Sequence, residues 1–189
     1  MLLLPGADGT YDVLGHYFIP ADNVAARVRR DGVPYDVWLR DGWLTATPGD
    51  ITDYGFIRAT AHELAERYRI AEIAYDRWNA SQLVVDLGAD GLTMTKFGQS
   101  GSPEMAAAVE EFERLVTAGR LRTGGDPVLR WMASNLAWRQ DAAGNQFPDR
   151  RASADKIDGI VGLLMAIGRA LTRAPVEEIV RPRIIFIDY

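Results

Sequence analysis

Two short apolar runs alternate with two helical segments in the middle of the chain, and this alternation restricts the fold more than any other feature. Polar residues ahead of an i, i+3, i+4 apolar spacing predict a helix that begins at Thr52 or Asp53. Buried strands are predicted at Ile70–Asp76 and Leu92–Phe97, with a helix at Ala80–Leu87 between them. This order is typical of parallel βαβ units, so an α/β protein is expected.

The first half of the chain also contains a predicted hairpin and a predicted long helix. β-branched and aromatic residues around a Pro-Gly turn predict the hairpin over residues 1–19. Irregular chain with a helical patch at Asn23–Arg30 follows it. A serine followed by proline and an acidic residue predicts a long helix from Ser102 to Gly119.

The last third of the chain is predicted to be loop-rich at first and then helical. A hairpin turn is expected at Asp141–Asn145, and an apolar helix at Ser153–Thr172. The chain has 189 residues, of which 48% are hydrophobic, and it shows neither an internal repeat nor a linker. Residues 1–189 are therefore expected to form a single domain.

The chain contains no cysteine and only two histidines, His16 and His62. Disulfides, thiolate zinc sites and cysteine nucleophiles are thereby excluded. A metal site would have to rely on carboxylates, which suit Mg²⁺ or Mn²⁺ better than zinc. The sequence has neither a membrane-length apolar run nor a secretory signal, so a cytoplasmic protein without a membrane partner is expected.

Charge is distributed unevenly along the chain. The formal net charge is −5, which by itself argues against a nucleic-acid partner. Residues 119–173, however, carry nine basic and five acidic side chains. This basic segment either is a solvated face or contacts DNA. Four cations are candidate phosphate contacts, namely Lys96, Arg150, Arg151 and Lys156.

Asp76 is the first candidate for chemistry, because it ends a predicted strand. In open α/β sheets, ligands collect outside the carboxyl ends of the strands. The alternative is that Asp76 caps the following turn or pairs with Arg77.

Two further carboxylates, Asp155 and Asp158, are predicted to share one face of the last helix because they are three residues apart. That face continues through Gly159 and Gly162, and each glycine inside a helix costs about 1 kcal/mol relative to alanine. Close approach of the helix to a sheet, with a carboxylate directed at a bound cation, would offset that cost. For Asp155 a favourable interaction with the helix dipole is the simpler reading.

Four segments in this order resemble one known family: YDRWNA at 75–80, FGQSGSP at 97–103, DPVLRWMASN at 126–135 and SADKIDG at 153–159. Together they resemble the nuclease half of the terminase large subunit of tailed phages. The resemblance implies a ribonuclease H-like fold, a mixed sheet with helices on both faces. It also implies cutting of concatemeric double-stranded DNA during genome packaging, with aspartates that hold Mg²⁺ or Mn²⁺. The terminase small subunit and the portal are the partners implied.

The resemblance assigns roles to individual aspartates. Asp76 corresponds to the family's aspartate at a strand end, and Asp158 to the one on its final helix. These two would be catalytic and would hold the ions, and Asp155 matches an auxiliary metal position. Two divalent ions held by anionic oxygens, with positions left for water and phosphate, can hydrolyse a phosphodiester.

Two departures from the family pattern lead to a second hypothesis. The sequence has no G-x-x-x-x-G-K-[ST] loop, so an ATPase motor is not expected in it. The family's first metal aspartate lies in a G-x-D strand upstream of the segment that residues 1–20 resemble. The chain is thus expected to begin one strand late. The alternative function is a catalytically inactive prophage remnant that acts as a DNA-binding or assembly module.

The C-terminal segment Arg183–Tyr189 has the profile of a buried strand. It follows Pro182 and gives four apolar residues and then Asp188. We expect this segment to fill the place of the absent strand and to bring Asp188 towards Asp76. The alternatives are an edge strand or a contact between chains.

Overall fold

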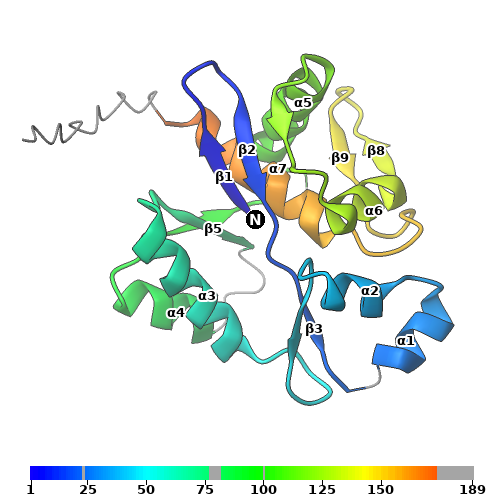
Figure 1. The fold of residues 1–189 in the computed structure, drawn as a ribbon. Coiled ribbons are helices and arrows are strands. Elements are labelled where there is room, and N and C mark those ends of the chain that lie inside the picture. The colour runs from blue at the N-terminus through cyan, green and yellow to red at the C-terminus, as the bar shows by residue number, and fades with distance from the viewer. Residues whose placement is uncertain (23, 77–81, 100, 174–189) are drawn as a thin grey trace, which may run out of the picture.

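The computed structural model describes residues 1–22, 24–76, 82–99 and 101–173, and it is a mixed α/β structure (Figure 1). Its elements in chain order are β1 (Leu2–Pro5), β2 (Tyr11–Leu14), β3 (Phe18–Pro20), α1 (Val24–Asp31), α2 (Tyr35–Arg40), β4 (Thr45–Thr47), α3 (Tyr54–Arg67), β5 (Ile73–Asp76), α4 (Gln82–Ala89), β6 (Met94–Phe97), α5 (Pro103–Thr117), β7 (Leu121–Arg122), α6 (Pro127–Asn135), β8 (Trp138–Gln140), β9 (Gln146–Pro148) and α7 (Asp158–Leu171). No helix among the described residues is both long and apolar enough to cross a membrane.

The alternation predicted in the middle of the chain is confirmed. Helix α3 begins after Asp53, whose side chain accepts a hydrogen bond from the backbone N–H of Gly55 at 2.7 Å. Strands β5 and β6 pair in parallel, with Asp76 opposite Phe97, and α4 connects them. The predicted start of that helix, at Ala80, lies outside the described residues. In Figure 1, β5 lies between α3 and α4 on one side and α7 on the other.

The N-terminal hairpin is also confirmed, and a strand that is distant in the sequence pairs with it. β1 and β2 pair antiparallel with Leu3 opposite Val13, and β7 adds to β2 in parallel. β3 does not continue the hairpin. It pairs in parallel with β4 instead.

The strands form short sheets that do not hydrogen-bond to one another among the described residues. The sheet β1-β2-β7 is mixed, β5-β6 and β3-β4 are parallel, and β8-β9 is the hairpin predicted around Asp141–Asn145. Within the described chain, β1 therefore has β2 as its one partner strand, and β5 has β6. Each of these two strands has an open edge.

Two helices were missed by the sequence pattern. Helix α2 lies in the stretch predicted to be irregular, and α6 lies in the stretch predicted to be loop-rich. Helix α6 is set by Asp126, whose carboxylate accepts hydrogen bonds from Val128 N–H and Leu129 N–H, and by proline at its start. Its Trp131 ring packs edge to face on Tyr35, with ring centroids 6.1 Å apart. These aromatic rings thus stabilise α2 and α6 through a tertiary contact, which the local spacing of apolar residues does not reveal.

The last helix begins later than predicted. Helix α7 starts at Asp158, and residues 153–157, which precede it, are bends and irregular chain. The expectation that Asp155 and Asp158 share a helix face is therefore wrong. Asp155 accepts a hydrogen bond from the backbone N–H of Lys156 at 2.7 Å, which fixes it in the turn.

Helix α7 lies at the centre of the core and packs on α5, α6, β1 and β5. Its glycines allow close approach. A Cβ at Gly159 would lie 2.7 Å from Met132 Sδ, and one at Gly168 would lie 2.7 Å from the Phe97 ring. Close packing therefore offsets the cost of glycine inside this helix.

Candidate active site

A hollow of about 520 Å³ opens at the carboxyl end of β5. Its walls come from β5, α5, α7, the loop after β6, the β8–β9 hairpin and the loop that follows β9. The lining residues are Asp76, Gln99, Met105, Arg139, Pro148, Asp149, Arg150, Arg151 and Val161. Two carboxylates and three guanidinium groups thus share one concave surface, at the edge of the sheet where α/β proteins bind ligands.

The loop that carries Arg150 and Arg151 is held by hydrogen bonds on both sides. The Asp149 carboxylate accepts hydrogen bonds from Arg151 N–H at 2.9 Å and from Ala152 N–H at 3.2 Å. On the C-terminal side of the loop, the backbone carbonyl of Asn135 accepts a hydrogen bond from Ala154 N–H. The side-chain amide of Asn135 donates one to the Lys156 carbonyl. These contacts fix the backbone that presents the two arginines to the hollow.

Asp158 is joined to the hollow through Arg150. The Arg150 guanidinium donates from Nη1 to Asp158 Oδ1 at 2.6 Å and from Nη2 to Gln99 Oε1 at 3.4 Å. Val161 lies one turn after Asp158 on the same side of α7, and it lines the hollow beside Asp76. Asp76 lines the hollow together with Arg150, and Arg150 binds Asp158, although 82 positions separate the two aspartates.

Three of the predicted site residues lie elsewhere. Asp155 faces Tyr35, whose pKa is raised to about 12 by burial, with smaller contributions from the charges of Asp31 and Asp155. Lys156 lies near Asp31, which belongs to the same set of side chains. The pKa of Asp31 is lowered chiefly by a hydrogen bond from Arg30, and Lys156 adds a smaller electrostatic contribution.

Lys96 is the third of these residues. It precedes Phe97, which is buried against α5 and α7, and successive side chains of a strand point to opposite faces. Lys96 is exposed and does not line the hollow. The structure therefore does not bring Asp155, Lys156 and Lys96 to this site, whereas it does bring Arg150 and Arg151 there.

Three polar lining residues were not assigned a role from the sequence: Gln99, Arg139 and Asp149. Gln99 belongs to a segment that carries the family resemblance, which was the one signal for it. Arg139 lies in β8, with its guanidinium 4.8 Å from the centroid of the Phe147 ring. Asp149 follows a strand and proline, a position that suggests a turn more readily than a site.

The far end of β5 is bound firmly to α7. Glu72 accepts hydrogen bonds from Thr95 at 2.6 Å and from Arg173 at 3.2 Å, and it forms an ion pair with Arg169 at 3.2 Å. Burial alone would raise the pKa of Glu72, but the hydrogen bonds from Thr95 and Arg169 outweigh it and lower that pKa. Because Glu72 precedes β5 and Arg169 ends α7, helix and strand run in opposite directions. The start of α7 is thereby held beside Asp76.

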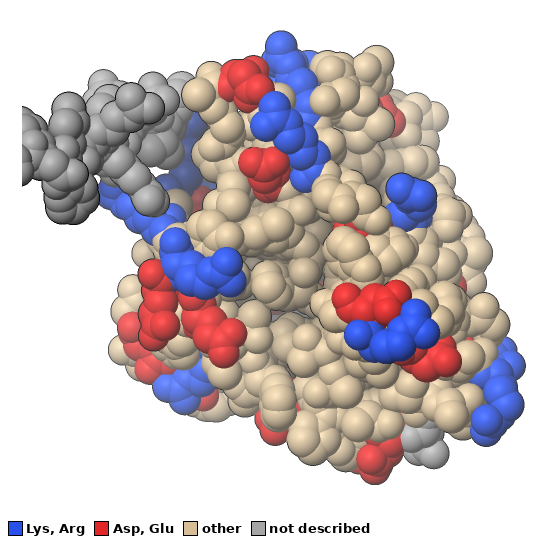
Figure 2. Space-filling model, viewed as in Figure 1, with Lys and Arg blue, Asp and Glu red and all other residues tan. Residues whose placement is uncertain are grey.

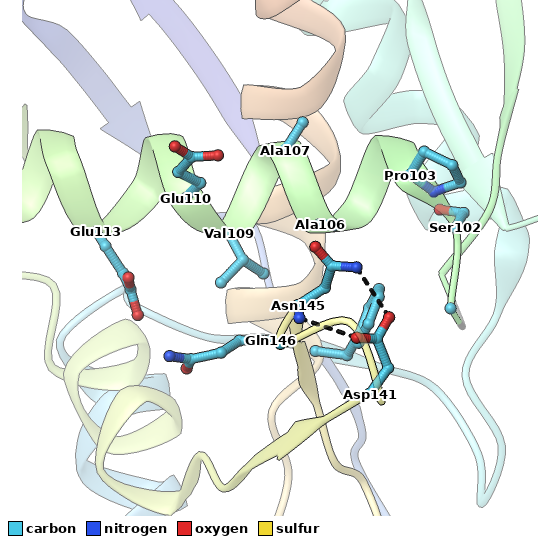
Figure 3. A pocket seen from close by; sticks show the side chains of 13 residues that line it. Ser102, Pro103, Ala106, Ala107, Val109, Glu110, Glu113, Asp141, Asn145 and Gln146 are labelled. Atoms are coloured by element: carbon cyan, nitrogen blue, oxygen red, sulfur yellow. Dashed lines mark hydrogen bonds between the residues drawn. The ribbon is translucent and has the colours of Figure 1, made fainter.

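A second, larger hollow of about 640 Å³ lies between α5 and the turn of the β8–β9 hairpin (Figure 3). None of its described lining residues is lysine or arginine, and Glu110, Glu113 and Asp141 make it acidic. Asp141 is used within the turn, where it accepts a hydrogen bond from the Asn145 side chain at 2.9 Å. An acidic surface repels phosphate, so the hollow beside Asp76 is the better candidate for binding an anionic substrate. On the face shown in Figure 2, basic and acidic side chains are interspersed.

The side chains at the smaller hollow have the chemistry that a hard divalent cation requires. No group of three or more His, Asp or Glu that could hold a metal ion is found among the described residues. Mg²⁺, however, is usually bound through one or two carboxylates, with water and substrate phosphate completing its shell. Asp76 and Asp158 supply two such carboxylates and therefore fit the ion in chemical type.

Comparison with known proteins gives the class and the family. The crystal structure of the HK97 bacteriophage large terminase superposes on this chain with a TM-score of 0.81 at 36% identity, covering 88% of this chain and 35% of that one. The chain therefore has the ribonuclease H-like α/β fold of terminase nuclease domains, as predicted.

Residues 3–174 match the family model described as the terminase large subunit, endonuclease domain, and the chain belongs to that family. It is 38% identical over 165 residues to the terminase large subunit of Enterobacteria phage HK97, covering 86% of this chain and 32% of that protein. It is 27% identical over 174 residues to Protein YmfN of Escherichia coli (strain K12), covering 89% of this chain and 38% of that protein. The chain thus spans about a third of the length of these relatives.

Proposed function

We propose that this chain is a divalent-cation-dependent endonuclease that cuts concatemeric double-stranded DNA during phage genome packaging. The observation that carries the proposal is the hollow at the end of β5, where Asp76 lies among Arg139, Arg150 and Arg151 and where Arg150 also binds Asp158. Carboxylates for a cation and guanidinium groups for phosphate are the two kinds of group that phosphodiester cleavage needs.

Asp76 and Asp158 would hold Mg²⁺ or Mn²⁺. The bound cations would supply an activated water and would neutralise charge on the phosphate that is cut. The remaining work is done by the chain itself. Arg150 and Arg151 would hold the DNA backbone against the hollow, on a loop fixed by Asp149 and Asn135.

The ion pair between Arg150 and Asp158 supports this proposal. The guanidinium beside Asp158 offsets the negative charge of that carboxylate. With a cation held at Asp158, the Arg150 guanidinium would be available to bind phosphate. Gln99 also binds this guanidinium, because its amide oxygen accepts a hydrogen bond from Arg150 Nη2 at 3.4 Å.

In a working packaging machine the partners would be the DNA, the terminase small subunit and the portal, in the cytoplasm of the host cell. We propose that residues 1–189 act as one unit there, since the core cluster runs from Val13 in β2 to Ile167 in α7.

A plasmid-nicking assay tests the proposed function. Purified chain should convert supercoiled plasmid to nicked and linear forms with Mn²⁺ or Mg²⁺, and EDTA should stop the reaction. Asp76→Asn should remove the activity, and Asp155→Asn, the matched control, should keep it. Cation-independent cleavage, or no cleavage by a folded chain that still binds DNA, would instead favour an inactive DNA-binding or assembly module.

A further inference from the structure

We infer that the edges of β1 and β5 form an acceptor site for one additional strand, and that its occupant is the C-terminal segment Arg183–Tyr189 of the same chain. Within the described residues β1 pairs with β2 and β5 pairs with β6, which leaves one open edge on each. Open edges present unpaired backbone donors and acceptors, and a strand is what satisfies them.

Helix α7 packs against both of the strands that have these open edges, β1 and β5. Near its start, Gly162 meets the Met1 side chain, and Val161 lines the hollow beside Asp76. Near its end, Arg169 and Arg173 bind Glu72, which precedes β5. β1 therefore begins at the end of α7 where β5 finishes, and a strand between them can run parallel to β5 and antiparallel to β1.

The partial exposure of β5 and β1 also supports an acceptor site for one more strand. All four residues of β5 are half-buried, although it is paired in parallel with β6 and includes Ile73 and Ala74. Parallel strands are normally covered on both faces and by neighbours on both sides. β1 is likewise half-buried along Leu2–Leu4. One more strand would bury the apolar atoms that both strands leave accessible.

The connection from α7 selects the occupant. The described chain leaves α7 beside the start of β5, where Arg173 donates from Nη2 to the carbonyl of Ala71 at 3.3 Å. A segment that turns back from this point runs in the direction of β5. Residues 174–182 span up to about 30 Å when extended, more than the length of a four-residue strand.

The sequence of the segment matches the site in length and in pattern. Ile184–Ile187 is a continuous apolar run of four residues, and β1 and β5 each have four residues. A continuous apolar run suits a strand covered on both faces, whereas an edge strand would alternate apolar and polar residues. Parallel strands end at the same edge of a sheet, so Asp188 would follow this run at the edge where Asp76 ends β5.

Disulfide trapping in the full chain tests the pairing, because the chain has no cysteine of its own. Cysteine is introduced at Ile185 or at Phe186, which covers both faces of the segment, and at either Ala74 in β5 or Leu3 in β1. Leu121→Cys in β7 is the matched control. Oxidation in dilute solution should give monomers with an internal disulfide for one tail position with Ala74→Cys and for one with Leu3→Cys. The Leu121→Cys control should give none.

Three outcomes would overturn the inference: no disulfide with either strand, disulfides only between chains, or trapping at Leu121→Cys as efficient as at the two edges. A second measurement guards against trapping of a rare state. Deletion of residues 183–189 should lower the thermal midpoint, since the edges of β1 and β5 would lose their partner. An unchanged midpoint would contradict the pairing.

The position of Asp188 rests on the proposed function and is tested separately by Mn²⁺ binding. Asp188→Asn should weaken Mn²⁺ binding by roughly tenfold in a chain whose disulfide pattern supports the pairing. An unchanged Mn²⁺ affinity would remove Asp188 from the site and leave the strand pairing intact. A parent chain that binds no Mn²⁺ would overturn the proposed function instead.

Discussion

The two ends of helix α7 carry similar ion pairs in very different surroundings. At its C-terminal end, the Glu72 side chain is 9% exposed and binds Arg169 and Arg173. At its N-terminal end, the Asp158 side chain is 61% exposed and its partner Arg150 is 50% exposed. Exposed ion pairs contribute about 0–1 kcal/mol, whereas a buried charged group that loses its partners costs several times as much. We therefore expect the ion pairs at the C-terminal end to contribute more to stability than the ion pair at the N-terminal end, where the proposed cation would bind.

Replacement at the exposed end should have the largest effect on activity. Asp158→Asn keeps the shape of the side chain and removes one charge from the proposed cation site. Metal ions contribute several kcal/mol to such reactions, and a loss of about 3 kcal/mol is roughly a hundredfold in rate. We expect at least that loss of plasmid cleavage, with DNA affinity unchanged or higher and the thermal midpoint unchanged. A variant that cleaves as fast as the parent would end the assignment.

Replacement at the buried end should reduce stability. Glu72→Gln removes the acceptor charge between Arg169 and Arg173, and hydrogen bonds to charged groups are worth about 1.5–3 kcal/mol. Urea unfolding at neutral pH should show a decrease in the free energy of unfolding within that range. Asp158→Asn, the matched exposed variant, should show about 1 kcal/mol or less.

The same comparison predicts a pH dependence. The pKa of Glu72 in the folded chain is lowered below the ordinary value of 4.5. Its charge therefore stabilises the fold above about pH 4.5, and that stabilisation is lost as the pH falls through the lowered pKa. The difference in stability between parent and Glu72→Gln should shrink over this acid range. A difference that is constant with pH would show that Glu72 acts by packing alone.

Glycine-to-alanine substitutions should likewise reduce stability more at the C-terminal end of α7 than at its N-terminal end. A Cβ at Gly168 would lie 2.7 Å from the ring of Phe97, which is buried in the core, so Gly168→Ala should destabilise the chain by about 1–3 kcal/mol. A Cβ at Gly162 would lie 3.0 Å from Met1 Cγ, on a side chain that can rotate away. Gly162→Ala should be near neutral in thermal unfolding. Equal losses for both variants would mean that the two ends are packed alike.

The smallest expected effect concerns the affinity for DNA. Arg150→Ala combined with Arg151→Ala should reduce the slope of log affinity against log salt by about 1–2, because each arginine that binds a phosphate displaces about one counterion from the DNA. Lys156→Ala is the matched control, since the structure places this lysine near Asp31. An unchanged slope in the double variant, or an equal change in Lys156→Ala, would move the DNA to another surface.

The parts of the fold that were predicted from the sequence are those set by local signals. The helices after Asp53 and Ser102 have caps, and β5 and β6 are apolar runs of strand length. Helices α2 and α6 were missed because their stability comes from aromatic residues, such as Tyr35 and Trp131, that meet only in the folded chain.

The candidate site was predicted only in part, because some of its positions are likewise set by contacts that form only in the folded chain. Asp76, Arg150 and Arg151 were identified and line one hollow. Asp155 was assigned to a helix face shared with Asp158, and that face does not exist, because the turn held by Asp149 and Asn135 delays the start of α7 to Asp158. Long-range hydrogen bonds of this kind have no signature in local spacing.

Asp76 and Asp158 are proposed to hold the same divalent cations, and Mn²⁺ affinity measured without DNA tests this proposal most directly. The concentration of free Mn²⁺, followed by electron paramagnetic resonance, gives the dissociation constant for the parent and for three single variants. Asp76→Asn and Asp158→Asn should each weaken binding by roughly tenfold or more, and Asp155→Asn should leave it unchanged. Binding that is insensitive to Asp158→Asn, or weakened equally by Asp155→Asn, would contradict the account.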